Sequence, residues 1–327
     1  MSVSEYIIKA QGMISKSSVR HVIFKKFIRI VFYIFLVSIA LIFLYPFLFI
    51  VVTSVKTNSD IYNVVVKWIP RQLNFNNFKI AYVSLDFLTY FKNSVLMTVF
   101  STIGHIISCS LVAYGLARYK FFGKNVLFMM VVVTMIVPVS TIIIPLYMEM
   151  VTISRLVGFA IDETLLPIIL PTFFGLGLQG PLFIFIYRQF YISLPYEMES
   201  AAKIDGCGPI KTFLYIMWPM SKAANITVLT LSVVWHWHSF YEPSILLRHS
   251  WQQPLPAKLA NIIHYISTPS ETVTNMMKEL GTSGGENVIN LAVLMAGALI
   301  VLAPVLIFFI IVQRQFMEGA ERTGLVE

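Results

Sequence analysis

The sequence predicts an all-α membrane protein with six transmembrane helices. Of its 327 residues, 57% are hydrophobic and only 12% are charged, which is more apolar surface than a water-soluble core of this length needs. Uncharged runs recur that could cross a hydrocarbon layer of roughly 30 Å, which takes about 20 helical residues. These runs do not alternate apolar and polar residues as the strands of a membrane β-barrel do.

The six predicted spans are Ile30–Val55, Asn93–Ala117, Asn125–Met148, Thr164–Tyr187, Ala223–Tyr241 and Val288–Gln313. The first is about twice as long as the apolar core of a secretory signal and has no small-residue cleavage site after it, so we expect it to be retained. Prolines inside the spans are expected to kink them: Pro138, Pro145 and Pro304.

Basic residues near the helix ends predict the orientation of the chain. They are densest just before the first span, and more follow the second, fourth and sixth spans. We therefore expect a cytoplasmic segment 1–29, a membrane domain 30–313 and a cytoplasmic tail 314–327. Within the domain, the inner loop is 188–222 and the long outer loop is 242–287. Contact with anionic lipid accounts for the net charge of +8, so no nucleic-acid partner is expected.

Sites for chemistry are missing from the sequence. The Gly-Lys pair at Gly123 is followed by asparagine, so it does not complete a phosphate-binding loop. No His, Asp or Glu cluster has metal-ligand spacing, and no serine elbow occurs. Cys109 and Cys207 fall in a span and an inner loop, so no disulfide is expected. The chain is predicted to be neither an enzyme nor a cofactor-binding protein.

The inner-loop stretch "EMESAAKIDGCGPIKTFLYIMWPM" begins at Glu197 and is predicted to form two short helices. On the first, one face holds Met198, Ala201, Ala202 and Asp205. Glycines at 206 and 208 break the helix, and a proline begins the second. The second helix has an apolar stripe of Ile210, Phe213, Leu214 and Met217. Spacing alone leaves two interpretations open, a helix offered to a partner or an interfacial connector.

The same stretch resembles the signature of permease subunits in binding-protein-dependent ABC importers. That signature reads E-A-A, three residues, G, nine residues, then I-x-L-P. Here Ser200-Ala201-Ala202, Gly206 and Ile216–Pro219 keep every interval, with serine in place of glutamate and Trp218 in place of leucine. The missing glutamate puts one polar contact to the ATPase in doubt, and Glu199 is a candidate substitute.

Other stretches extend the resemblance over nearly the whole chain. In order, they are "YPFLFIVVTSVK", "FKNSVLMTVFST", "AYGLARYKFFGKN", "IVPVSTIIIPLYMEM", "ISLPYEMESAAKIDG", "WHWHSFYEP" and "QRQFMEG". They are similar to the carbohydrate branch, and to the second permease of a maltose-type pair. The resemblance implies a type I ABC importer permease fold in the bacterial inner membrane, with both termini cytoplasmic.

The resemblance also implies partners and a coupling helix. The partners are a homologous permease, two cytoplasmic ATPase subunits that bind ATP-Mg, and an external solute-binding protein. The coupling helix to the ATPase comprises Glu199, Ser200, Ala201, Ala202, Lys203, Ile204, Asp205 and Gly206. Residues 269–287 of the outer loop look longer than is usual, and we expect them to contact the binding protein or the partner permease.

Polar and aromatic residues on the fifth span are candidates for the solute path. They are Asn225, Trp235, His236, Trp237, His238 and Tyr241. Polar groups at this depth usually face a bundle interior, and flat rings suit the apolar faces of sugars. The alternative is that these side chains pack against the partner permease or anchor at the outer interface. His105 on the second span is expected to make an interhelical hydrogen bond.

Two other functions remain open. One is an importer of this family for a non-sugar solute, such as a glycerol phosphate or a polyamine. The other is a secondary transporter, which would need buried carboxylates or lysines along the spans. The interiors of the predicted spans contain none.

Overall fold

The computed structural model describes residues 3–63, 65–177, 179–267 and 290–324, and the regular elements in these ranges are helices. Four helical segments are long and apolar enough to cross a membrane: Phe24–Ser54, Phe87–Arg118, Val139–Val157 and Leu291–Met317. They belong to α1 (Val3–Ser54), α4 (Phe87–Arg118), α6 (Val139–Val157) and α16 (Leu291–Gly324). The first, second and last predicted spans are thereby confirmed as apolar helices.

Helix α4 lies at the centre of the bundle, packed against α7 (Leu166–Thr172), α8 (Gly180–Ser193) and α12 (Lys222–His238). Its buried side is made largely of small residues, including Ser101, Gly104 and Ser108. Small residues let membrane helices approach closely, where van der Waals contacts and hydrogen bonds hold them together. A Cβ on Gly104 would lie 2.3 Å from Thr172 Oγ1, so this crossing requires glycine.

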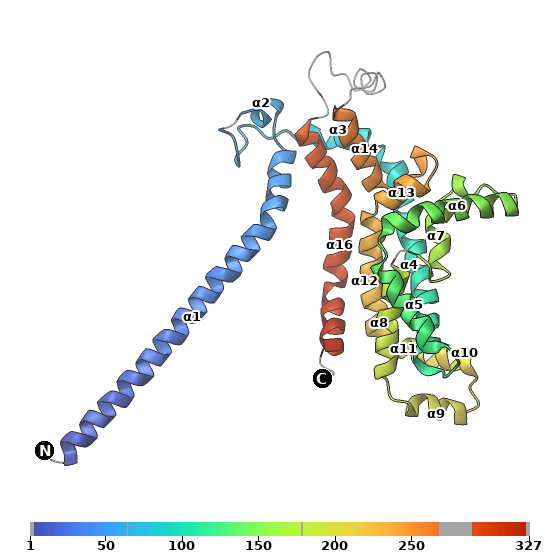
Figure 1. Ribbon diagram of the computed structural model, residues 1–327. Helices are drawn as coiled ribbons and strands as arrows, with labels where there is room; N and C mark the ends of the chain where they lie inside the picture. Colours follow the sequence, from blue (N-terminus) through green and yellow to red (C-terminus); the bar gives the residue numbers. More distant parts are fainter. Residues whose placement is uncertain (1–2, 64, 178, 268–289, 325–327) are drawn as a thin grey trace.

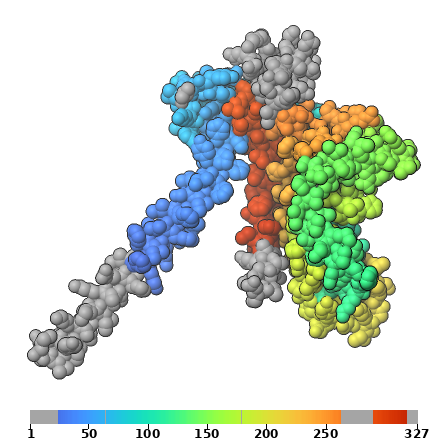
Figure 2. All heavy atoms as spheres, in the orientation of Figure 1, coloured from blue at the N-terminus to red at the C-terminus, as the bar shows by residue number. Residues whose placement is uncertain are grey.

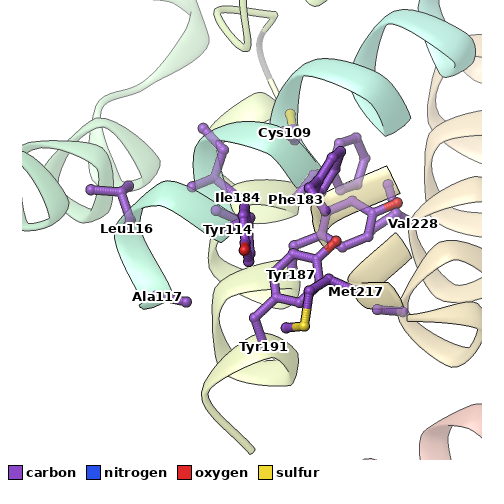
Figure 3. Close-up of a cluster of buried hydrophobic side chains, with 13 residues drawn as sticks. Cys109, Tyr114, Leu116, Ala117, Phe183, Ile184, Tyr187, Tyr191, Met217 and Val228 are labelled. Atoms are coloured by element: carbon purple, nitrogen blue, oxygen red, sulfur yellow. The ribbon is translucent and has the colours of Figure 1, made fainter. Parts of the chain in front are cut away.

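An aromatic core joins α4, α8 and the inner loop (Figure 3). Phe183, Tyr187 and Tyr191 recur every four residues on α8 and are fully buried. They pack with Tyr114 of α4 and with Met217 of the inner loop. The four-residue spacing places all three rings on one face of α8, and that face fixes the inner loop to the bundle.

Helix α1 leans away from the bundle and meets it near its C-terminal end, where it packs on α16 (Figure 1). In Phe24–Ser54, the apolar segment of α1, the most hydrophobic stretch contains no residue buried by the rest of the chain. Figure 2 shows the same separation in the space-filling view. Its side chains are therefore left to lipid or to another protein.

The third predicted span, Asn125–Met148, is not one helix. Helix α5 (Lys124–Ile136) ends before Pro138, and α6 begins at Val139. Proline disfavours the helical conformation in the residue before it, and Val137 is extended with a ψ of 125°. Figure 1 shows α6 turned across the direction of α5.

The fourth and fifth predicted spans were also wrong in extent. The fourth, Thr164–Tyr187, is divided into α7 and α8 by a connection in which Gly175 has a φ of 70°. The carbonyl of this glycine lies against Gly180 so closely that an added Cβ would be 2.4 Å away. The fifth ends at His238, and Tyr241 begins the separate helix α13 (Tyr241–Leu246).

The inner loop folds as predicted into two short helices with a break between them. Helix α9 (Glu197–Ile204) is followed by Gly206, whose φ of 79° is a left-handed conformation that suits glycine. Then come α10 (Pro209–Thr212), a π-helical turn (Phe213–Met217) and α11 (Trp218–Met220). Half of the predicted apolar stripe is buried, Phe213 and Met217, while Ile210 and Leu214 are exposed.

The connections at the other end of the bundle contain short helices. They are α2 (Asn58–Ile61), α3 (Asn76–Ser84), a 3-10 turn (Ile161–Glu163), α13, a second 3-10 turn (Ser250–Gln252) and α14 (Leu255–Ser267). Lys56 Nζ donates to the carbonyls of Val66 and Lys67 at 3.0 and 2.9 Å, which orders the first of these connections. The outer-loop segment 269–287, for which we predicted a partner, lies outside the described residues.

Candidate functional site

Helix α9 lies at the far end of the molecule, at the same end as the start of α1 and the end of α16 (Figure 1). Most of its side chains are exposed, and Ile204 is 87% exposed. The exposed members of the predicted coupling helix are Ser200, Ala201, Lys203, Ile204, Asp205 and Gly206. A surface with exposed apolar side chains beside charged ones is typical of a docking site.

Two members of the predicted coupling helix face the protein's own interior. Glu199 and Ala202 are the buried residues of α9. Glu199 Oε1 lies 3.1 Å from Arg118 Nε, and the two side chains are 7% and 0% exposed. Glu199 was a candidate to replace the missing glutamate in a contact to another protein, and in this structure its carboxylate instead contacts Arg118 of the same chain. Likewise, Ala202 does not share the exposed face of Met198 and Ala201.

Arg118 makes two further contacts around this buried pair. Its Nη2 donates to the carbonyl of Leu194 at 2.6 Å, and its guanidinium lies 4.4 Å from the ring centroid of Tyr196. The Nε and Oε1 atoms of the ion pair are close but not aligned for a hydrogen bond. Charge attraction, the Leu194 hydrogen bond and ring stacking thus hold the guanidinium in place.

A pocket lies between the C-terminal end of α12 and helix α7. Two predicted solute-path residues line it, Trp235 and His236. Its other lining residues are Leu146, Pro167, Ile168, Pro171, Thr172, Gly177, Gln179, Ser239, Glu242 and Leu246. Its wall is largely apolar with a few polar groups, but its volume is about 30 Å³, far below that of a complete small-molecule site, so it offers only part of a binding surface. The α7 residues could not be assigned from the sequence, because they line the pocket only through the separation of α7 from α8 and the packing of α7 on α4 and α13.

His236 connects this pocket to α4. Its ring stacks on the His105 ring with centroids 5.2 Å apart, and its Nε2 lies 3.3 Å from His105 Nδ1. The predicted interhelical hydrogen bond of His105 is confirmed by this contact and by Ser232 Oγ of α12 at 3.4 Å. The other ring nitrogen of His105, Nε2, faces Gly177 of the pocket wall. A Cβ added to Gly177 would lie 2.5 Å from this nitrogen.

The remaining solute-path candidates lie elsewhere. Trp237 is buried and its Nε1 donates to the carbonyl of Val301 on α16 at 2.9 Å. Asn225 Oδ1 accepts from the Tyr187 hydroxyl at 2.9 Å near the N-terminal end of α12. His238 is exposed and contacts the carbonyl of Val234, and Tyr241 lies on α13. The structure therefore brings two of the six candidates to one pocket.

In the described ranges, no three His, Cys, Asp or Glu side chains come together as metal ligands. The polar groups of the pocket are an imidazole, a carboxylate, an amide and hydroxyls. They are suited to hydrogen bonding with a solute.

Comparisons with known proteins identify the family. Residues 107–317 match the family described as "Binding-protein-dependent transport system inner membrane component". A putative ABC transporter permease, ORF2 of Caldicellulosiruptor sp., is 32% identical over 225 residues, which cover 69% of this chain and 78% of that protein.

Two relatives come from Bacillus subtilis. The arabinooligosaccharides transport system permease protein AraQ is 25% identical over 300 residues, covering 91% of this chain and 95% of that protein. The melibiose/raffinose/stachyose import permease protein MelC is 29% identical over 276 residues, covering 84% and 88%.

A solved structure has the same fold. It is the crystal structure of a bacterial ABC transporter involved in the import of the acidic polysaccharide alginate, with a TM-score of 0.72 and 22% identity. The match covers 89% of this chain and 97% of that one. The inner-loop signature, the all-helical membrane fold and the match over residues 107–317 agree. The chain belongs to the family of binding-protein-dependent transport system inner membrane components, and is a multi-pass permease subunit of an ABC importer complex.

Proposed function

We propose that this chain forms, with a homologous permease, the translocation path of an ATP-driven importer for an oligosaccharide. The observation that carries the proposal is helix α9, which has the family's signature spacing and presents a largely exposed face at one end of the bundle. The names of the relatives, which include importers of arabinooligosaccharides and of melibiose, raffinose and stachyose, support the solute class.

In this proposal, α9 docks on a cytoplasmic ATPase subunit through Ser200, Ala201, Lys203, Ile204, Asp205 and Gly206. The small Ala201 leaves room for close approach, and the apolar Ile204 gains most from being covered. ATP-Mg binds to two such ATPase subunits and not to this chain. An external binding protein delivers the solute from the opposite side.

We further propose six membrane crossings, made by α1, α4, α5, α8, α12 and α16. Helices α8 and α12 pack alongside α4, and α5 packs on α8. Helix α6 then lies near the outer surface. Six crossings place both termini on the side of α9, which is the cytoplasmic side. The dense basic residues before the first span support this orientation.

The solute contacts this chain at the pocket beside α12. The exposed part of Trp235 provides a flat apolar surface for a sugar ring, and His236, Gln179 and Glu242 provide hydrogen-bonding groups for its hydroxyls. The homologous permease forms the other wall of the path.

Affinity purification from membranes tests the proposal. The tagged chain should bring down a second permease and an ATPase, identified by mass spectrometry. Cells should take up labelled oligosaccharide only when this chain is present, and unlabelled oligosaccharide should compete while glycerol phosphate and polyamines should not. Recovery of the chain alone would contradict the importer complex, and competition by a polyamine would contradict the solute class.

A further inference from the structure

Arg118 lies where three parts of the protein meet: the inner end of α4, the connection between α8 and α9, and α9 itself. Its guanidinium contacts the Glu199 carboxylate, the Leu194 carbonyl and the Tyr196 ring. The arginine side chain is fully buried. A single side chain from α4 thus contacts both α9 and the segment that leads into it.

Helix α9 has few other attachments to the bundle. It has eight residues, of which Glu199 and Ala202 are buried. The chain leaves it through Gly206, a flexible type of residue. The contacts of Arg118 are therefore the main polar link between α9 and the membrane helices in the described structure.

Helix α4 extends from this link to the pocket. His105 precedes Arg118 by 13 residues, which is about 20 Å along an α-helix at 1.5 Å per residue. His105 contacts His236, which lines the pocket. A continuous helix with a buried side along α8 is a stiff connection, so a displacement of its inner end also moves its middle.

We propose that Arg118 is a positioning residue that holds α9 to α4, so that movement of α9 on the ATPase is carried along α4 to the solute pocket. The inference rests on the proposed docking of α9 to an ATPase. A buried ion pair suits this task because separating two charges that water cannot solvate is unfavourable. An exposed pair separates at little cost, because water solvates both charges. The contact to Leu194 makes the segment before α9 move with it.

The test measures solute imported per ATP hydrolysed in vesicles that contain the complete transporter. The variants are Arg118→Met, which keeps the length of the apolar stem, and Glu199→Gln, which keeps the shape of the carboxylate. Both variants should retain the ATPase on purification and continue to hydrolyse ATP. Solute per ATP should fall by about tenfold or more, within the range of measured coupling between sites.

The double variant gives a second result that depends on the contact itself. If Arg118 and Glu199 act through one another, Arg118→Met with Glu199→Gln should lower solute per ATP no further than the worse single variant. Controls are Arg155→Met and Glu149→Gln, two exposed positions on α6, at the opposite end of the molecule from α9 (Figure 1). Both controls should keep the native ratio.

Arg118→Lys keeps the test decisive if the methionine variant does not fold. Lysine retains the charge but cannot hold both Glu199 and Leu194 with a planar fork, so the ratio should lie between those of the native protein and Glu199→Gln. Native ratios in both Glu199→Gln and Arg118→Lys would overturn the inference, as would loss of the ATPase from these variants on purification. If the native chain itself neither retained an ATPase nor imported solute, the proposed function would fail first and the inference with it.

Discussion

At the residue scale, two tryptophans on α12 illustrate how neighbouring side chains take different roles. Trp235 is 46% exposed and lines the pocket, whereas Trp237 is 5% exposed and donates a hydrogen bond to α16. Residues two apart on a helix point in widely different directions, so one faces the pocket and the other faces α16. The sequence analysis made both tryptophans solute-path candidates by residue type and position, and their contacts show that only Trp235 lines the pocket.

We expect Trp235→Ala to raise the KM for solute by roughly tenfold, which corresponds to about 1.4 kcal/mol of lost contact. Trp237→Phe should leave KM unchanged but lower the stability of the detergent-solubilised protein by about 1 kcal/mol, because one buried hydrogen bond is lost. Uptake kinetics and thermal unfolding of the two variants check this. An unchanged KM in Trp235→Ala would exclude that ring from the solute path.

At the scale of the element, the packing of α4 against α7 requires a residue without a side chain at position 104. Gly104 crosses Thr172 and Phe173 at distances that leave no room for a methyl group, whereas a Cβ on Gly115 of the same helix would meet nothing within 4 Å. The two glycines therefore form a matched pair.

Gly104→Ala should destabilise the protein by about 1–3 kcal/mol, because α7 must move away from α4. Gly115→Ala should be neutral or stabilise α4 by up to about 1 kcal/mol, since alanine is the better helix former. Thermal unfolding of the purified chain in detergent measures both. Equal unfolding midpoints for the two variants would contradict the close α4–α7 crossing.

Substitutions at two adjacent alanines on α9 distinguish an effect on docking from an effect on folding. Ala201 is exposed, so Ala201→Arg should leave the chain folded while abolishing recovery of the ATPase on purification. Ala202 is 2% exposed, so Ala202→Arg should lower the yield of folded chain, because the larger side chain would have to displace its packed neighbours. Retention of the ATPase by Ala201→Arg would show that this face of α9 is not the docking surface.

The sequence predicted local features of these elements better than their three-dimensional relations. The break of α9 at Gly206 and the start of α10 at Pro209 are set by backbone conformation, so they could be read directly. A bend at Pro138 was predicted from the same kind of rule, but the length of the apolar run concealed that the helix ends there. The burial of the Glu199 side chain could not be predicted from the sequence, because it depends on Arg118, which is 81 positions away in the chain.

At the scale of the whole molecule, part of the surface of this chain is left uncovered. Helix α1 leaves the bundle with its apolar surface uncovered, and the pocket is bounded on this chain's side by α7, α12 and α13. Both features agree with a subunit that works in a complex. In the proposed account, ATP closes the ATPase pair and α9 moves, and the bundle then turns as a rigid body between two states.

Solute uptake by reconstituted vesicles tests this account most directly. Vesicles should contain this chain, the second permease, the ATPase and the binding protein, with labelled oligosaccharide outside. We predict that uptake requires both ATP at the α9 side and binding protein at the opposite side, and that it stops when either is omitted. Uptake by vesicles that hold this chain alone, without ATP and driven by an ion gradient, would contradict the account and indicate a secondary transporter.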